Sequence, residues 1–498
     1  MSSLKRIISG TISGLVRNFS NIIIHILSLP IYLTFWSIKL YGVWILLLTV
    51  VSILKVPLYS YREYLGNEFL KLGKKNKKKI SKILYGSTII MFLYGAILIF
   101  LLILILNQTD FLYYLTIDEA LINDVRNALI LLFILEILGF VVSLFNHALY
   151  PFHYYPKINW ISLIITIVVP ISQILTVVLG FGLIELSIIT FLIVVSLNIL
   201  FFIYILTLIK IEKINYIKFY FLKNLNHLKK SSFLMLGHFI IIFKNQGVRL
   251  ILVPFLGSVQ MITYVAMKTA SNLMSQLFSS FANSFLVEFI DYINEKNDRA
   301  YIYSYTMLYI IFILIIIPFA FFFQIAAPVV FEIWTRDKII FDPILFASMT
   351  GSFLIMIFYY PASIILQGKN LYKQSLVISI FVSISFILIL LLMLDYYLIR
   401  GAGYTLIIIE ILTGIFYFYY SYKWLDKNFI RFNFKIIILT LLDLLISIIF
   451  IFIISLNKIN TYYVINLFII FKIFSALFFF KLLPKKIKHK ILKLNINA

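Results

Sequence analysis

The sequence has no cysteine and few acidic residues, with only 20 Asp and Glu among 498 residues. Without cysteine the chain can form no disulfide and offers no thiolate ligand to a metal. Charged residues of both signs make up only 13% of the chain, whereas soluble domains usually carry about 25%. This composition excludes an ordinary soluble protein.

The sequence also lacks the motifs that carry common chemistry. It contains no P-loop, no Gly-rich dinucleotide fingerprint, no aspartate-rich sugar-nucleotide motif, and no group of His and carboxylates at metal-ligand spacing. The net charge of +23 would favour a nucleic-acid partner in a soluble protein, but here membrane topology explains most of it. We therefore expect no enzyme, no bound metal, no cofactor and no nucleic-acid partner.

Long apolar segments are abundant instead, because 62% of the residues are hydrophobic. Each holds roughly 20 largely apolar residues, the length that crosses a hydrocarbon core of about 30 Å. Repeated segments of this length predict an all-α integral membrane protein, because only a helix satisfies all its own backbone groups in lipid. We predict about fourteen transmembrane helices, near residues 8–35, 41–60, 84–106, 128–149, 159–181, 183–209, 231–256, 260–290, 303–333, 343–366, 375–394, 403–421, 436–455 and 462–480.

Lys and Arg are distributed unevenly among the connections. With the N-terminus inside, 31 of the 43 Lys and Arg fall by count in the termini and the connections after even-numbered helices, and 6 fall in outside loops. This asymmetry follows the positive-inside rule and predicts that both termini are cytoplasmic. The Lys-rich runs at 74–79 and 485–490 then act as topology signals, although they would also suit anionic lipid or a partner.

Two segments resemble each other and suggest an internal repeat. Residues 17–44 and 238–266 each contain a polar-dotted helix, then a proline (Pro30 and Pro254), a brief turn and a tyrosine (Tyr41 and Tyr264). The match pairs the first predicted helix with the seventh. We predict a six-helix lobe over 1–215, a second over 225–425, an appended helix pair over 435–482 and a basic cytoplasmic tail over 483–498.

Polar and charged residues lie on coherent faces of four predicted helices. A charge at mid-membrane costs at least about 2.5–3.5 kcal/mol, so such residues normally face protein or water. The stripes recur at helical spacing and predict a shared polar cavity, although Arg17 and Arg62 alternatively snorkel to the surface and small polar residues hold helices together. The candidate substrate-binding residues are Arg17, Asn21, His25, Lys55, His238, Lys244, Asn245, Arg249, Lys268, Asn272 and Gln276.

The chemistry of these residues indicates an anionic, hydroxyl-rich ligand. Lys and Arg attract anions strongly at low dielectric, and guanidinium and ammonium groups suit phosphate oxygens. Amides such as Asn245 and Gln276 pair with sugar hydroxyls. The predicted ligand is therefore a sugar phosphate.

Four carboxylates are also predicted inside the membrane, at Glu136, Glu288, Glu410 and Asp443. Intramembrane carboxylates often act as relays, so they are candidates for coupling to a proton or sodium gradient. Alternatively each pairs with a neighbouring Lys or a backbone group. Membrane potential acting on the cavity cations is a third source of energy.

The stretch Leu29-Pro30-Ile31-Tyr32 to Tyr41-Gly42-Val43-Trp44, and its counterpart from Arg249 through Pro254-Phe255-Leu256-Gly257 to Tyr264, resemble the polysaccharide biosynthesis (O-antigen, Wzx-type) flippases of the multidrug/oligosaccharidyl-lipid/polysaccharide exporter superfamily. The resemblance implies two six-helix lobes around a central cavity open alternately to either side. Its cargo would be an undecaprenyl-diphosphate-linked oligosaccharide for O-antigen, lipopolysaccharide or capsule. The phosphates would be held by Arg17, Lys55, Arg249 and Lys268.

The same resemblance implies a bacterial inner-membrane location and, as partners, membrane lipids and the polysaccharide polymerase machinery. Three alternatives remain open. A peptidoglycan-precursor or teichoic-type flippase would suit the same cationic cavity. A multidrug exporter of the same superfamily would need acidic cavity residues, and a membrane-embedded polymerase or ligase would need a larger external loop than residues 107–127.

Overall fold

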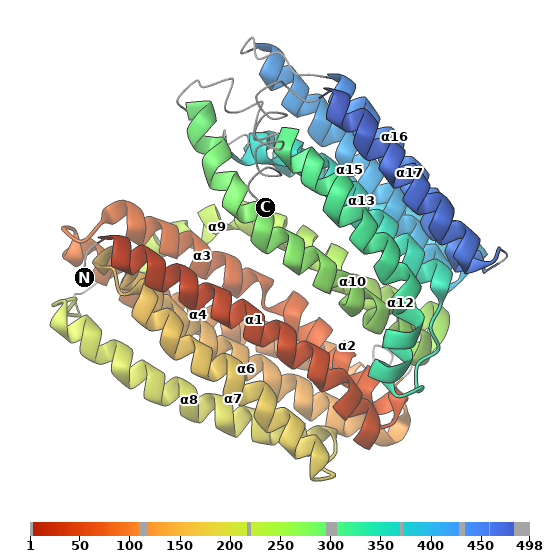
Figure 1. The fold of residues 1–498 in the computed structure, drawn as a ribbon. Coiled ribbons are helices and arrows are strands. Elements are labelled where there is room, and N and C mark those ends of the chain that lie inside the picture. The colour runs from red at the N-terminus through yellow and green to blue at the C-terminus, as the bar shows by residue number, and fades with distance from the viewer. Residues whose placement is uncertain are drawn as a thin grey trace. The chain divides into compact units, whose positions relative to one another are not determined.

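The computed structural model (Figure 1) describes residues 3–108, 113, 117–216, 221–294, 306–368, 372–427, 434–457 and 459–482. These residues form helices joined by short turns, and none of them lies in a β-strand. Among them are 11 helices long and apolar enough to cross a membrane, or up to 12 when one bent pair counts as a single span. The prediction of an all-α membrane protein is confirmed.

Two features explain why the larger count, 12, is below the predicted fourteen. The predicted helices 231–256 and 260–290 share one apolar segment, Leu234–Gln276, because the chain stays helical on both sides of a kink at Gly257. That glycine has φ 82° and ψ 167°, a conformation that only glycine adopts readily. The apolar part of the first helix, Phe19–Phe35, is short.

The chain divides into two compact units, and the first comprises Met1–Ile262 and Trp334–Lys338. In unit 1, α1 packs against α7, α6 packs against α4 and α8, and α3 packs against α6 and α9. The elements of unit 1 are α1 (Ser3–Phe35), α2 (Ile38–Leu54), α3 (Val56–Leu72), α4 (Lys77–Asn107), η1 (Glu119–Leu121), α6 (Ile122–Ala148), η2 (Tyr150–Phe152), α7 (Tyr155–Val178), α8 (Leu183–Ile211), α9 (Phe221–Ile242), the π-helix η3 (Phe243–Gly247) and the start of α10 (Val248–Asn294).

Unit 2 comprises Thr263–Ile333 and Ile339–Ala498. Its most buried helix is α13, which packs against α15 and α16, while α14 packs against α15 and α17 against α16. Its elements are the rest of α10, the π-helix η4 (Phe312–Ile316), α12 (Ile317–Thr335), α13 (Pro343–Gly368), α14 (Tyr372–Tyr397), α15 (Ile399–Lys427), α16 (Phe434–Leu456) and α17 (Thr461–Leu482).

The boundary between the two compact units falls inside α10. Because α9 packs against α3, residues 221–242 belong to unit 1. The six-helix lobes over 1–215 and 225–425 stay a prediction. The predicted pair 435–482 corresponds to α16 and α17, which pack against each other. The predicted basic tail, 483–498, lies outside the described residues.

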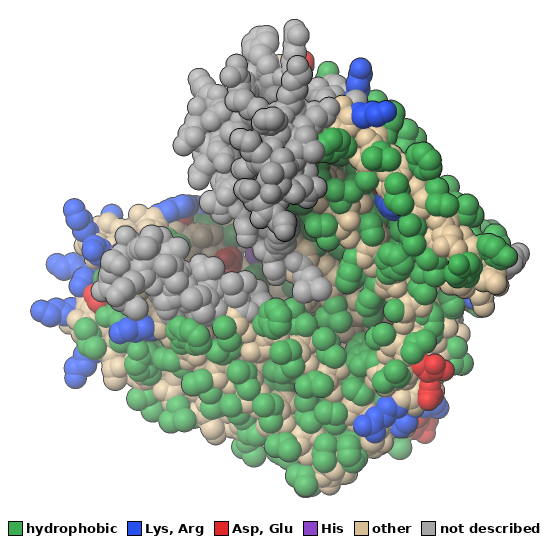
Figure 2. Space-filling model, in the orientation of Figure 1, with side chains coloured by type: hydrophobic (Ala, Val, Ile, Leu, Met, Phe, Trp, Pro, Cys, Tyr) green, Lys and Arg blue, Asp and Glu red, His purple; other side chains and the backbone are tan. Residues whose placement is uncertain are grey.

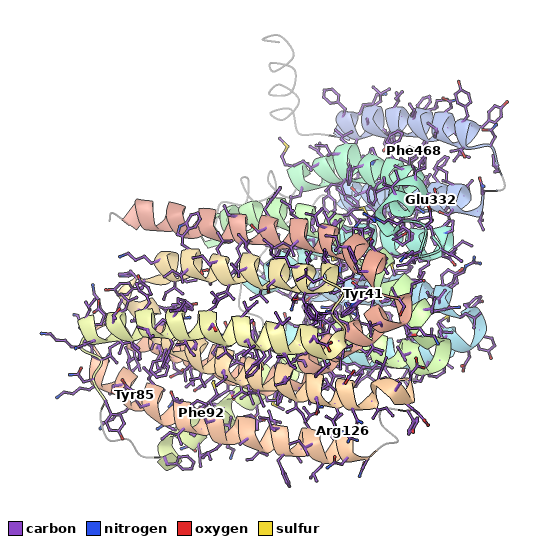
Figure 3. All side chains as sticks on the ribbon, turned by 90° about the horizontal axis from the view of Figure 1, so that it is seen from below. Tyr41, Tyr85, Phe92, Arg126, Glu332 and Phe468 are labelled. Carbon is purple, nitrogen blue, oxygen red and sulfur yellow. The ribbon has the colours of Figure 1, made fainter. Side chains whose placement is uncertain are left out.

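Side chains on the outward faces suit a lipid environment. Figure 2 shows hydrophobic side chains covering α7 and α8, with Lys and Arg gathered at one end of the unit 1 helices. The turn between α3 and α4 carries exposed lysines such as Lys74 and Lys75, and the charge distribution of the sequence predicts that this turn is cytoplasmic. Figure 3 shows the contrast within unit 1 between Phe92 of α4, 45% exposed, and Tyr41 of α2, 8% exposed.

Candidate substrate-binding site

The site begins at a break between α2 and α3, which meet at an angle of 46°. Lys55 both ends α2 and precedes α3, and Pro57 follows in the first turn of α3. Proline has no amide hydrogen and its ring clashes with the carbonyl four residues earlier, so a straight helix cannot continue through this point. The break therefore coincides with Lys55, whose side chain is 31% exposed.

Lys55 forms an ion pair with Glu136 of α6. Its Nζ lies 2.8 Å from Glu136 Oε1, and the two side chains are 31% and 28% exposed. Sequence analysis gave pairing with a neighbouring Lys as one alternative for Glu136. Packing of α6 against α2 and α3 brings about such a pair, with Lys55 as the partner.

One turn before the break, α2 contacts the π-helix η3 and the start of α10. Ser52 Oγ donates to Gln246 Oε1 at 2.5 Å, and Arg249 Nη1 donates to the buried Thr49 Oγ1 at 3.1 Å. The wider turn of η3 lies next to these polar contacts, and single π-turns are frequent at functional sites. Lys244 is half-buried in the same element, and Asn245 is exposed.

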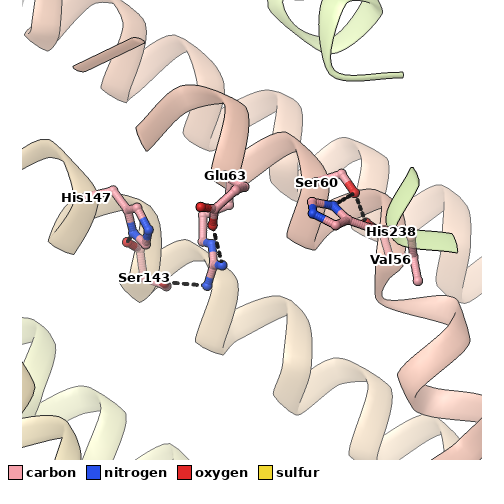
Figure 4. A network of polar contacts seen from close by, with 7 residues as sticks. Val56, Ser60, Glu63, Ser143, His147 and His238 are labelled. Carbon is pink, nitrogen blue, oxygen red and sulfur yellow. Dashed lines mark hydrogen bonds and ion pairs between the residues drawn. The ribbon is translucent and has the colours of Figure 1, made fainter. Parts of the chain in front are cut away.

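Beyond the break, α3 carries a second group of polar contacts (Figure 4). Arg62 donates to Glu63 Oε2 at 3.0 Å and to Ser143 Oγ at 3.2 Å, and its guanidinium lies 4.6 Å from the centre of the Tyr59 ring. Ser60 Oγ lies 2.9 Å from Nδ1 of His238 on α9. Arg62 is therefore held by an acid, a hydroxyl and an aromatic ring.

The remaining candidates of the first helix lie on α1. Arg17 and Asn21 are both half-buried. The side chain of His25 lies outside the described ones. The helix that carries them, α1, packs against α7.

Three further candidates lie on the part of α10 that belongs to unit 2. Lys268 is half-buried there, while Asn272 and Gln276 are exposed. Lys55, His238 and Arg249 therefore belong to unit 1, whereas Lys268, Asn272 and Gln276 belong to unit 2.

The other candidate coupling carboxylates have partners of their own in unit 2. Asp443 Oδ2 lies 2.5 Å from Lys472 Nζ, and its Oδ1 accepts a hydrogen bond from Ser475 Oγ. Glu410 accepts a hydrogen bond from the Tyr359 hydroxyl at 2.5 Å. The side chain of Glu288 lies outside the described ones. Within the described residues, no group of three or more His, Asp or Glu is arranged to hold a metal ion.

Sequence analysis missed the partners that organise the site. These residues are Thr49, Ser60, Glu63, Ser143 and Gln246. Small polar residues are common in membrane helices, and nothing in their spacing distinguishes a helix contact from a ligand contact. Only the pairing of α2 with η3, and of α3 with α6 and α9, singles them out.

The described cluster of unit 1 keeps an excess of positive charge. Lys55, Arg62, Lys244 and Arg249 are basic, whereas Glu63 and Glu136 are acidic. Half-exposed basic groups close to hydroxyls and amides can bind an anion that also carries hydrogen-bonding groups. The arrangement suits binding of such an anion.

Solved structures with the same fold are available for comparison. A lipid II flippase, MurJ, in an inward closed conformation has a TM-score of 0.62 at 16% identity, covering 95% of this chain and 98% of that chain. An inward-facing multidrug resistance MATE family transporter of the MOP superfamily has a TM-score of 0.58 at 12% identity, covering 85% and 98%. The chain has the fold of MOP-superfamily transporters.

A third MOP-superfamily transporter, from Pyrococcus furiosus, has a TM-score of 0.53 at 11% identity, and the shares covered are 84% and 94%. Its binding pocket is described as having reverse polarity, which suggests a different function for that protein. The chain matches no protein-family model and no curated protein.

Proposed function

We propose that this protein is a flippase that carries undecaprenyl-diphosphate-linked oligosaccharide repeat units across the bacterial inner membrane by alternating access, for surface polysaccharide such as O-antigen or capsule. The observation that carries the proposal is the extent of the match to the lipid II flippase. That match covers 95% of this chain, whereas the MATE family transporter covers 85%. A lipid-linked cargo therefore fits the full length of the fold better than a small drug does.

The charge of the unit 1 cluster supports the same class of cargo. Moving a diphosphate out of bulk water is unfavourable unless cations replace its hydration, and Arg binds phosphate oxygens through paired N–H donors. Arg249 is half-buried and next to the Ser52–Gln246 contact, so charge and neutral hydrogen-bonding groups lie together. In the proposal, Arg17, Lys55, Arg249 and Lys268 hold phosphate.

A multidrug exporter of the same fold is the main competing function. Cationic drugs would need an available carboxylate, but Glu136 is bonded to Lys55 and Glu63 is bonded to Arg62. The Pyrococcus furiosus transporter illustrates that pocket polarity differs between proteins of this fold. A peptidoglycan-precursor or teichoic-type cargo would use the same cations, so those functions differ from the proposed one only in the glycan.

In the proposed orientation both termini are cytoplasmic. The exposed lysines between α3 and α4 then meet the anionic inner leaflet, as the positive-inside rule requires. Membrane lipids and the polysaccharide polymerase machinery are the proposed partners. Energy would come from a proton or sodium gradient acting on a carboxylate, or from membrane potential acting on the basic residues.

The decisive experiment replaces Arg249 by Gln, which keeps a hydrogen-bonding side chain and removes the charge. Loss of a charge-assisted bond costs roughly 1.5–3 kcal/mol, or about tenfold or more in occupancy. We expect surface polysaccharide to fall by that factor and lipid-linked glycan to accumulate on the cytoplasmic side, at normal protein levels. If Arg249 holds phosphate by charge alone, Arg249→Lys should reduce export less than Arg249→Gln does. If Arg249 binds two phosphate oxygens through paired N–H groups, Arg249→Lys should also reduce export strongly.

The matched control is Phe100→Leu, because Phe100 is 61% exposed on the outward face of α4. It should leave export unchanged. Normal export by an Arg249→Gln, Lys268→Gln double mutant would remove the cationic site. Loss of drug resistance with intact polysaccharide in the same variants would favour the exporter instead.

A further inference from the structure

The first helix contains a proline that interrupts its own hydrogen bonding. Pro30 lies inside α1 and has no amide hydrogen, so the carbonyl of Ile26, four residues earlier, loses its intrahelical donor. Within a membrane an unpaired carbonyl is unfavourable by several kcal/mol, so neighbouring groups normally supply a replacement donor. Identifying that donor shows which part of the chain can control the direction of α1 at Pro30.

The replacement donor is the indole of Trp334. Its Nε1 lies 2.6 Å from the Ile26 carbonyl oxygen, a hydrogen bond between residues 308 positions apart. Trp334 is half-buried and opens the segment Trp334–Lys338, which belongs to unit 1 with α1. Tryptophan suits this position because its N–H is a donor only and its ring fills apolar space.

A second side chain of the same segment binds α1 on the other side of Pro30. Lys338 Nζ donates to the carbonyl of Leu33, which is among the last four carbonyls of α1 and therefore has no donor within the helix. A cation is also favourable at a helix C-terminus. Arg336 and Asp337 adopt left-handed φ values of 53° and 60°, which turn the segment so that both side chains reach α1.

We propose that Trp334 is a positioning residue of the transport site: it completes the hydrogen bond that Pro30 leaves open and so fixes the direction of the half of α1 that carries Arg17 and Asn21. The stretch from Ile26 to Arg17 is about 13 Å long at about 1.5 Å per residue. A change of about 10° at the kink therefore moves Arg17 by about 2 Å, enough to break a phosphate contact. This role rests on the proposed function, because it acts through the ligands of α1.

A double-mutant cycle between Trp334 and Pro30 tests the proposal. Trp334→Phe keeps the ring and removes the donor, and we expect export per protein molecule to fall roughly three- to tenfold. Pro30→Ala restores an amide that bonds to the Ile26 carbonyl within the helix. In the Pro30→Ala background, Trp334→Phe should therefore change export by less than about twofold, because the carbonyl no longer needs the indole.

Hydrogen exchange gives a second measurement, which does not depend on the cargo and is made beside the export assay. Hydrogen exchange of the α1 amides near residues 26–34 should be faster in Trp334→Phe and return towards its starting rate in the double mutant. The control is Trp36→Phe, which removes the indole bond to the Phe181 carbonyl at 3.0 Å. Pro30→Ala should not rescue the Trp36→Phe variant, because the carbonyl that Trp36 binds belongs to Phe181 and not to Ile26.

The outcomes separate the two proposals. If exchange follows the cycle while polysaccharide export does not, the bond between Trp334 and α1 stands and its role in transport is overturned. If Trp334→Phe leaves both exchange and export unchanged, or is equally harmful with Ala at position 30, the positioning role itself is overturned. Failure of the proposed function would instead appear as normal export by the Arg249→Gln, Lys268→Gln double mutant.

Discussion

Two lysine–carboxylate pairs within helical bundles differ in their surroundings. Lys55 and Glu136 of unit 1 are 31% and 28% exposed and lie at a helix break beside hydroxyl and amide groups. Lys472 and Asp443 of unit 2 are 11% and 4% exposed and lie between α17 and α16. The first pair is accessible to a ligand, whereas the second is enclosed.

The remaining contacts of each pair strengthen this difference. Ser475 satisfies the second oxygen of Asp443, and the Lys472 ammonium lies 5.5 Å and 5.4 Å from the ring centres of Phe468 and Phe471. A buried pair with all its groups satisfied mainly specifies how two helices meet. An accessible pair can exchange its partner for an ionic ligand at much lower cost. We therefore propose a structural role for Asp443–Lys472 and a role in binding for Lys55–Glu136.

The largest expected effect is on stability when the enclosed pair is broken. Lys472→Met leaves the Asp443 carboxylate buried without its cation, which should reduce the free energy of unfolding by about 3–5 kcal/mol. Replacing both residues, as Asp443→Leu and Lys472→Met, should recover most of it. Thermal unfolding in detergent measures both variants. A double mutant as unstable as the single one would contradict the structural assignment.

An intermediate effect is expected at Lys55–Glu136, and it should appear in binding rather than in stability. Lys55→Gln should weaken binding of a lipid-linked diphosphate by about fivefold, while Glu136→Gln should strengthen it by a similar factor, because the lysine no longer has a competing carboxylate. The free energy of unfolding should change by about 1 kcal/mol or less in each variant. Titration of the purified protein measures the binding.

The two substitutions should change the binding affinity in opposite directions, which a purely structural ion pair would not do. Glu136→Gln should also slow release of the cargo, so export can fall although affinity rises. If both substitutions weakened binding equally, Glu136 would be a ligand or a coupling residue and not a competitor. Asp443→Asn, which lies in unit 2, serves as a control that should leave affinity unchanged in protein that remains folded.

The smallest effect is expected at a third pair, at the predicted cytoplasmic end of unit 1. Lys77 Nζ lies 3.5 Å from Glu212 Oε2, and the side chains are 39% and 22% exposed. Lys77→Gln should lower the free energy of unfolding by less than about 1 kcal/mol, and salt near 1 M should abolish the difference. Thermal unfolding at two salt concentrations measures it. A large effect that salt does not alter would show that exposure is a poor guide to the role of these pairs.

The charged residues of the helices could be predicted from the sequence, but their partners could not. Charge at mid-membrane is rare enough to mark Lys55, Arg249 and Asp443 as important, because the cost of burying a charge is large in any membrane helix. The partners of these residues were not predictable. Glu136 lies 81 positions from Lys55 and Thr49 lies 200 positions from Arg249, and helical periodicity relates residues only within one helix.

The sequence by itself determined that the protein is an all-α membrane protein with basic residues inside its helices, because apolar length and charge cost are local properties of each segment. Only the tertiary structure decided which charge is accessible and which is enclosed, since exposure depends on the helices that pack around it. It also decided that the indole of Trp334 meets the carbonyl that Pro30 leaves open. The proline predicts that a donor is needed, but only the packing of a distant segment supplies it.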